Sequence, residues 1–264
     1  MTLEVLVSTM NQVDHDLLER MNIQSDAVVV NQCDRDETEI FEYKGNKVKW
    51  ISMTPRGVGL SRNTCLMHAS ADIVLFADDD MQYQEGYAEK VLSIFEKNEG
   101  ADVICFNIKL ENSTKNIGGH RNNQKCKRLH TFNSMRYGAT LMAARRKALL
   151  RERISFSLLF GGGAEFNSGE DSIFVKDCLD AGLKLYSDTY CLGRVDDSHS
   201  SWYRGINDKF FVDRGMVYAT AFPRISWLIF IYYACRLSKL DAKYGFIKIH
   251  SLFYKGKKIL EVYK

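Results

Sequence analysis

The feature that most constrains the fold is residues 71–80, where an apolar run ends in three consecutive aspartates. An uninterrupted run of this kind is typical of a strand buried on both faces of a mostly parallel sheet, and here it consists of Ile73, Val74, Leu75 and Phe76. In open α/β sheets, ligands bind just beyond the carboxyl ends of the strands. The stretch therefore predicts a ligand site at a sheet edge, lined by Asp78, Asp79 and Asp80.

Three adjacent carboxylates repel one another and lose hydration unless a cation joins them. Carboxylate oxygens suit Mn²⁺ or Mg²⁺, and Mg²⁺ usually combines one or two carboxylates with the phosphates of a substrate. The alternative is a solvated acidic turn without a ligand. The buried strand that precedes the aspartates favours the metal site over the turn.

Strand-like and helix-like patterns alternate along the first part of the chain. Strands are predicted over residues 3–8, 27–30, 48–52, 73–76 and 102–108. Helices are predicted over residues 14–22, 60–70 and 85–98, and a further charged helix over 145–153. This alternation predicts right-handed βαβ crossovers, and so an α/β fold with a mostly parallel sheet flanked by helices.

The length of 264 residues fits one large α/β domain, alone or with a helical annex. We expect residues 1–203 to form the α/β domain and residues 204–264 to form an apolar and basic helical extension. From Arg204 onward there are 12 Lys or Arg against 4 Asp or Glu, whereas the formal net charge of the chain is only +3. A basic end on a mildly acidic protein indicates an anionic partner, a membrane surface first, and nothing supports nucleic acid.

Residues 216–237 are strongly apolar, but Pro223 and Arg224 divide them and leave about 12 uninterrupted residues. A helix needs ~20 apolar residues to span a bilayer. The segment is therefore interpreted as a helix that either packs in a core or lies at a membrane surface. Its aromatic residues and the basic tail favour the membrane surface.

The cysteines and the N-terminus bear on the compartment. The seven cysteines are scattered, with no C-x-x-C pair, so reduced thiols are expected rather than zinc or disulfides. The first residues lack the basic and apolar regions of a signal peptide. These features predict a cytoplasmic protein, peripheral at the cytoplasmic face of the membrane if its basic end binds lipid.

A second acidic element, Gly169-Glu170-Asp171, follows a glycine-rich segment at 161–163. Apolar residues after Asp171 have helical spacing and the pattern stops at Gly182, so both carboxylates lie at a helix N-terminus. The helix dipole favours carboxylates there even without a chemical role. Capping and catalysis are therefore both open for Glu170 and Asp171.

Taken in order over roughly residues 3–200, these elements resemble the family-2 glycosyltransferases of the GT-A fold. The matching segments are the end of the first strand at 9–11, Gly-Val-Gly-Leu-Ser-Arg-Asn at 57–63, the D-x-D element within 71–80 and the Glu-Asp pair within 169–171. Each segment is weak alone, and their order carries the likeness. The resemblance implies a Rossmann-like GT-A domain that transfers a sugar from a nucleotide-diphosphate donor to an acceptor hydroxyl, usually with inversion.

The resemblance also implies roles for the acidic residues. Asp78 and Asp80 would be the D-x-D pair, with Asp80 the better candidate for direct contact with Mn²⁺ or Mg²⁺ and Asp78 nearer the ribose or a metal-bound water. Asp171 would be the general base, and Glu170 would hold acceptor hydroxyls or orient the loop. His199 would lie near the metal and the diphosphate, with an ordinary loop histidine as the alternative.

On the acceptor side, Gly162 and Gly163 would let backbone approach the sugar, unless they belong to a plain flexible loop. The acceptor would be a saccharide or a lipid-linked saccharide, because a lipid-linked acceptor would explain the apolar and basic C-terminus. This makes bacterial surface polysaccharide biosynthesis the hypothesis for the biological role.

The donor-binding residues implied by the resemblance are Thr9, Asn11, Gln32, Asp34, Arg62, Asp78 and Asp79. Arg62 would lie over the base or the pyrophosphate, with a salt bridge at the helix start as the alternative. One segment departs from the family, which often ends its second strand in an Asp-Asp-Gly-Ser-like sequence. Here the segment is Asn31-Gln-Cys-Asp34. Gln32 can still read a base edge, so a uridine diphosphate sugar is the first expectation and the base preference is open.

Two other classes of function compete with a glycosyltransferase. A nucleotidyltransferase would be expected to carry a glycine-rich and basic loop after its first strand, and residues 8–14 contain neither glycine nor lysine. A non-catalytic binding protein of the same fold has no reason to keep uncompensated carboxylates at 78, 80 and 171. Both arguments favour the enzyme that transfers a sugar.

Overall fold

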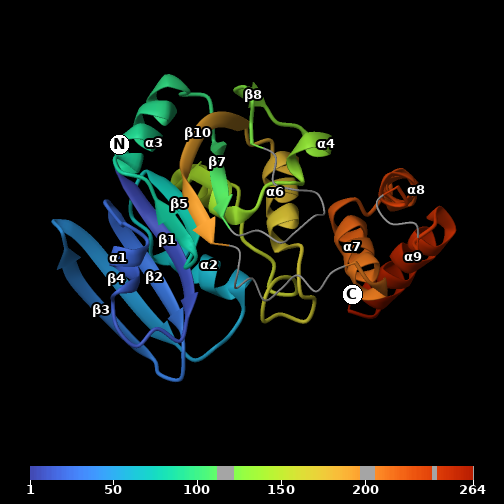
Figure 1. The fold of residues 1–264 in the computed structure, drawn as a ribbon, viewed down its shortest axis with the longest axis horizontal. Coiled ribbons are helices and arrows are strands. Elements are labelled where there is room, and N and C mark those ends of the chain that lie inside the picture. The colour runs from blue at the N-terminus through green and yellow to red at the C-terminus, as the bar shows by residue number, and fades with distance from the viewer. Residues whose placement is uncertain (112–121, 197–205, 240–242, 264) are drawn as a thin grey trace.

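A mixed sheet forms the body of the protein in this computed structural model, which describes residues 1–111, 122–196, 206–239 and 243–263 (Figure 1). Within the described residues the sheet has ten strands. Nine follow one another in the order β3-β4-β2-β1-β5-β9-β7-β10-β6, and β8 pairs with β10. The predicted α/β fold with a mostly parallel sheet is confirmed.

The parallel part of the sheet contains four of the predicted strands. They are β1 (Leu3–Met10), β2 (Asp26–Gln32), β4 (Asn46–Met53) and β5 (Ile73–Asp78). Every residue of β5 except the last is buried, as expected for a strand with both faces covered. The edge strand β3 (Glu37–Tyr43), which was not predicted, pairs antiparallel with β4 through a tight turn at Lys44 and Gly45, both with positive φ.

The other part of the sheet mixes strand directions. The short strand β9 (Met142–Arg145) runs antiparallel between β5 and β7 (Val103–Glu111). The long strand β10 (Leu185–Asp196), also not predicted, runs parallel to β7 with two shifts in register. The pieces β6 (Met81–Tyr83) and β8 (Lys127–Arg128) pair antiparallel with β10.

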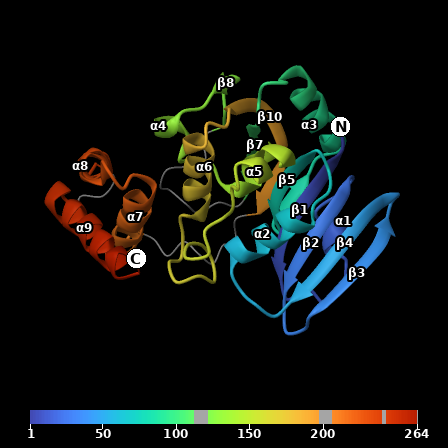
Figure 2. The same ribbon diagram turned by 180° about the vertical axis from the view of Figure 1, so that it is seen from behind.

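Helices flank the sheet, and three of them form a separate group beside α6 (Figures 1 and 2). The flanking elements are α1 (Leu17–Arg20), α2 (Val58–His68), α3 (Tyr87–Lys97), α4 (Thr131–Ser134), η1 (Ala139–Leu141), α5 (Arg146–Arg151) and α6 (Glu170–Asp180). The group at the C-terminal end contains α7 (Asp208–Ala221), α8 (Ser226–Leu237) and α9 (Phe246–Val262). The helix predicted over 14–22 is much shorter than expected, because only Leu17–Arg20 is helical.

Buried apolar side chains form two clusters. The larger one lies around the sheet and draws on all its strands except β3 and β8. The smaller one lies among α7, α8 and α9, but it also takes in Phe160, Phe166 and Ile173 from the loop before α6 and its first turn. The division at residue 203 therefore stays a proposal, since the second cluster reaches across it. In the part of the chain described, no helix combines the length and the apolar character needed to cross a bilayer.

Candidate active site

The carboxyl ends of parallel strands bring polar side chains to one edge of the sheet. Parallel pairing of β1 with β2 sets Thr9 beside Asn31. The hydroxyl of Thr9 donates a hydrogen bond to Asp79 Oδ2 at 2.6 Å. Asp79 and Asp80 are exposed, whereas Asp78 is half-buried. The acidic stretch therefore lies where the sequence places it, beside the end of β1.

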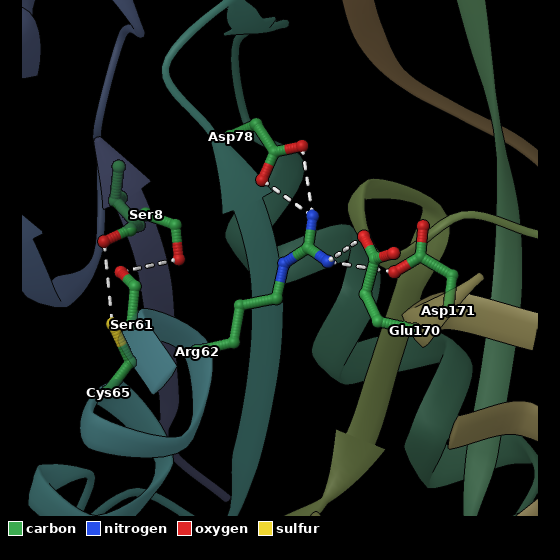
Figure 3. Close-up of polar contacts among 8 residues, drawn as sticks. Ser8, Ser61, Arg62, Cys65, Asp78, Glu170 and Asp171 are labelled. Atoms are coloured by element: carbon green, nitrogen blue, oxygen red, sulfur yellow. Dashed lines mark hydrogen bonds and ion pairs between the residues drawn. The ribbon is translucent and has the colours of Figure 1, made fainter. Parts of the chain in front are cut away.

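Arg62 joins this sheet edge to the first turn of α6 (Figure 3). Its side chain is only 3% exposed. One terminal nitrogen, Nη2, donates to both carboxylate oxygens of Asp78, at 2.9 and 3.0 Å. The other, Nη1, donates to Glu170 Oε1 at 3.1 Å and to Asp171 Oδ1 at 2.8 Å. A single buried cation thus holds three carboxylates from two elements, β5 and α6.

The close packing of α2 aims Arg62 into the site. A Cβ atom on Gly59 would meet the carbonyl oxygen of Ser157 at 2.2 Å, so the helix can approach this segment only with glycine at that position. The amide side chain of Asn63 exchanges two hydrogen bonds with the backbone of Phe156, each of 2.8 Å. The segment 57–63 therefore docks α2 on the loop before α6, and this docking sets the direction of Arg62.

The pKa of the Asp171 carboxyl is raised toward neutral pH. Burial raises its pKa from the usual 3.8 to about 7, against the lowering effect of the Arg62 guanidinium. Glu170 and Asp78 also raise the pKa of Asp171, because like charges disfavour its ionisation. Burial lowers the pKa of Arg62, but the three carboxylates raise it by more, so the pKa of Arg62 is raised overall. A carboxyl that titrates near neutral pH can accept a proton and release it again.

The turn before α6 is supported from the C-terminal helices. Gly169 has a φ of 115°, a left-handed conformation that favours glycine. A Cβ atom there would meet Val217 Cγ2 of α7 at 2.2 Å. The backbone that carries Glu170 and Asp171 therefore lies directly against α7.

The glycine-rich loop packs against the start of α2. The N–H of Val58 donates to the carbonyl oxygen of Gly162 at 2.8 Å. A Cβ atom on Gly161 would meet Val58 Cγ1 at 2.6 Å and Glu170 Cδ at 2.9 Å. One built on Gly163 would approach the backbone of Gly57 to 3.2 Å. Two of the three glycines thus allow close packing, and contact of Gly162 and Gly163 with an acceptor stays a prediction.

The sequence comparison decides the family. Residues 5–154, more than half of the chain, match the family described as Glycosyl transferase family 2. The chain belongs to glycosyl transferase family 2. It is a glycosyltransferase, as its ordered segments predicted. No curated protein matches the chain.

Solved structures similar to this family-2 glycosyltransferase include several of S. aureus TarS. The structure of TarS 1–349 in complex with UDP-GlcNAc has a TM-score of 0.65 and 17% sequence identity, and the match covers 93% of this chain and 75% of that one. Another structure of TarS 1–349 gives a TM-score of 0.59 at 16% identity over 83% of this chain, and a third, of TarS, gives 0.62 at 16% over 93%. This chain spans only 65% and 45% of the TarS chains in those two structures. At such identities the likeness establishes the fold.

The predicted donor-binding residues fall at the sheet edge, but several already contact protein. Gln32 is buried, and its Oε1 accepts a hydrogen bond from the N–H of Gly57 at 2.6 Å. Asn11 has a φ of 55°, and its side chain accepts a hydrogen bond from Arg56 at 3.2 Å. Asp34 is exposed. The structure brings Thr9 and Asn11 close to this edge, and contact of these residues with a nucleotide stays a prediction.

Of the predicted D-x-D pair, Asp80 would suit a cation that is shared with a substrate, whereas both carboxylate oxygens of Asp78 already accept hydrogen bonds from Arg62. Among the described residues, no group of three or more His, Cys, Asp or Glu side chains is placed to hold a metal ion alone. A Mg²⁺ ion bound through one or two carboxylates plus substrate phosphates needs no such group. Asp80 is exposed at the sheet edge and has the oxygen ligands that Mg²⁺ and Mn²⁺ prefer. The predicted ligand His199 lies outside the described residues.

Arg56 is a candidate that sequence reasoning missed. It lies in the turn between β4 and α2, is exposed, and donates to the carbonyl oxygen of Gln32 as well as to Asn11. An exposed guanidinium at the end of the parallel strands can pair with a phosphate. In the sequence, the signal was a basic residue just before the start of a helix that follows a parallel strand.

Proposed function

We propose that this glycosyltransferase moves a sugar from a uridine-diphosphate sugar to an acceptor hydroxyl, with inversion at the anomeric carbon and with Mn²⁺ or Mg²⁺. The observation that carries the proposal is the contact of Arg62 with both Asp78 and Asp171, which joins the D-x-D element and the candidate base in one site. The structures of S. aureus TarS in complex with UDP-GlcNAc and with UDP support a uridine nucleotide donor.

Asp171 acts as the base in this proposal. Its carboxylate takes the proton from the acceptor hydroxyl as the oxygen forms a bond to the anomeric carbon. The bond from that carbon to the diphosphate oxygen breaks, and its electron pair leaves with the nucleotide diphosphate. A single base suits a direct displacement, whereas a retaining glycosidase uses two carboxylates that flank the bond.

Arg62 positions the reacting groups. Its Nη1 donates to Asp171 Oδ1 at 2.8 Å, and this bond fixes the orientation of the carboxylate that takes the acceptor proton. Its Nη2 holds Asp78 at the end of β5, next to the aspartates proposed for the donor side. Glu170, which shares Nη1 with Asp171, would hold acceptor hydroxyls or orient the loop.

The divalent cation would be held by Asp80, with Asp78 and His199 as the further proposed ligands, and Thr9, Asn11, Gln32, Asp34 and Asp79 would line the donor pocket. When bound, the cation neutralises charge on the departing diphosphate. The exposed position of Asp80 supports this assignment.

We place the reaction in surface polysaccharide biosynthesis, with a saccharide or lipid-linked saccharide acceptor and peripheral contact with the cytoplasmic face of a membrane. We further propose that residues 1–203 form the transferase domain and residues 204–264 an extension that serves this contact. The exposed apolar side chains of α8 support the extension's role.

The test is calorimetric titration with uridine diphosphate, with and without Mn²⁺. We expect wild type to bind only with the cation, and Asp80→Ala to lose that binding. The matched control is Asp177→Ala, which removes another exposed aspartate, on α6 but away from the sheet edge, and should bind like wild type. Binding that is equally strong in Asp80→Ala would overturn the metal assignment, and wild type that binds guanosine or thymidine diphosphate instead would overturn the uridine donor.

A further inference from the structure

The solvent-facing side of α8 is apolar. Its exposed residues recur at helical spacing and form one face of the helix: Trp227 (51% exposed), Leu228 (46%), Ile231 (41%) and Tyr232 (52%). The opposite face, which includes Ile229, Phe230 and Ala234, is buried. A helix that packs against one partner needs only one apolar face. The second apolar face of α8 therefore serves something other than the packing seen in this fold.

The buried face of α8 already accounts for its place in the fold. The ring of Phe230 lies 5.5 Å from that of Phe253 in α9, measured between centroids. The ring of Tyr233 stacks on that of Tyr218 in α7 at 4.4 Å. The side chains of the outer face are large, apolar and adjacent, and soluble proteins seldom leave such side chains exposed without a binding role.

Positive charge flanks this outer face at both ends. Arg224 is exposed just before the helix, and Arg236 and Lys239 are exposed at its end. Residues 226–237 contain no Asp or Glu. The face therefore combines an apolar centre with a cationic margin.

Two of the acids in the C-terminal helices are engaged elsewhere, because Asp213 pairs with Lys209 at 2.7 Å and Asp208 with Lys248 at 3.2 Å. At a membrane surface, Trp and Tyr prefer the level of the headgroups and Arg and Lys bind anionic phosphates. The 12 residues of α8 suit a helix that lies on a bilayer rather than one that crosses it.

We infer that the outer face of α8 docks on an anionic lipid surface, with Trp227 and Ile231 inserted among the headgroups and Arg224 and Arg236 paired with lipid phosphates. The inference deepens the proposed function and rests on it in one respect, the lipid-linked acceptor. The helix α7, on which α8 packs, also supports Gly169 through Val217, so docking fixes the base side of the site relative to the lipid.

The test is flotation of the full chain with vesicles of phosphatidylcholine alone and of phosphatidylcholine mixed equally with phosphatidylglycerol. We expect binding to the anionic vesicles that weakens at high salt. Trp227→Ala/Ile231→Ser should weaken it roughly tenfold or more, because two inserted apolar side chains are lost. Arg224→Gln/Arg236→Gln should weaken it by about fivefold for each charge removed.

The control is Ile40→Ser, which removes an apolar side chain that is 60% exposed on β3, far from α8 in the fold (Figure 1). It should float like wild type. The inference is overturned if wild type does not bind anionic vesicles. It is also overturned if Trp227→Ala/Ile231→Ser binds them as well as wild type does. A wild-type dimer that dissociates in Trp227→Ala/Ile231→Ser overturns it too, because the occupant is then a second copy of the chain. Flotation uses neither donor nor acceptor, so its failure is distinct from failure of nucleotide binding.

Discussion

The two halves of the proposed active site rest on different supports. The donor half, with Asp78 to Asp80 and Thr9, stands on the ends of parallel strands whose side chains belong to the large cluster around the sheet. The base half, with Glu170 and Asp171, stands on the first turn of α6, where the small cluster of the C-terminal helices begins. Each half could therefore shift independently of the other if nothing joined them.

The difference between the halves shows why Arg62 matters. It comes from α2, which packs on β1 and β2, yet it bonds to carboxylates on both sides. The donor half is built by local strand geometry, while the base half depends on contacts between segments that are distant in sequence. Substitutions can therefore damage one half, the other, or only the link between them.

The largest expected effect separates chemistry from donor binding. Asp171→Asn should lower kcat by about 10²- to 10⁴-fold, because the amide cannot accept the acceptor proton. Calorimetry should show unchanged binding of uridine diphosphate, since the donor half is intact. Asp177→Asn, an exposed position on the same helix, is the control and should keep wild-type kcat. Loss of nucleotide binding in Asp171→Asn would mean that the halves are not separable.

Removing the link comes next. Arg62→Gln should lower the free energy of unfolding by about 3 kcal/mol, measured by urea denaturation, because three carboxylates lose the buried cation that compensates them. In Arg151→Gln, which breaks the exposed pair with Glu152, the loss should be at most about 1 kcal/mol. Equal stability of the two variants would show that the carboxylates need no internal cation.

The support behind the base half can be tested with two glycines. Gly169→Ala and Gly182→Ala both put a side chain at positive φ, but only position 169 faces a close neighbour, Val217. Gly182→Ala should cost about 1 kcal/mol of unfolding free energy from backbone strain alone. Gly169→Ala should cost about 2 kcal/mol more, and adding Val217→Ala should recover part of that excess. If the two substitutions lower the free energy of unfolding equally, α7 does not support this part of the site.

The smallest effect is a pH dependence that reports on the base half alone. Because the pKa of Asp171 is raised to about 7, kcat/KM should fall as the pH drops below about 7. Arg62→Gln should move this limb to higher pH, because the cation that favours ionisation is gone.

The folded protein also holds the proton of Asp171 more tightly than the unfolded chain does, so the contribution of Asp171 to stability should decline as the pH rises from about 4 to about 7. A limb near the usual pKa of 3.8 would contradict the burial of this carboxyl.

Local patterns were enough to predict the elements that carry the candidate site. The apolar run of β5, the helix start at 57–63 and the helix after Asp171 each carry their signal within a few neighbouring residues. The strands β3 and β10 were not predicted, because β3 is an edge strand with largely exposed, charged side chains and β10 has two register shifts and few buried positions in a row. Neither one presents a continuous apolar run.

The link between the halves could not be predicted from patterns at all. Arg62 is separated from Glu170 and Asp171 by 108 and 109 residues, and nothing near Arg62 in the sequence indicates those partners. The contact of Gly59 with Ser157 is of the same kind. Long-range packing decides both contacts, so neither could be predicted from the sequence around one of the partners.

The packing of Val217 on Gly169 has a consequence for modularity. If the C-terminal helices only anchored the enzyme, they could be replaced by those of a relative without any other change in sequence. Here the turn that carries the proposed base has no room for a Cβ atom because of Val217, a side chain in the proposed extension. Any transplanted extension must therefore match residue 169 of its new host, and the two parts are expected to change together rather than one at a time.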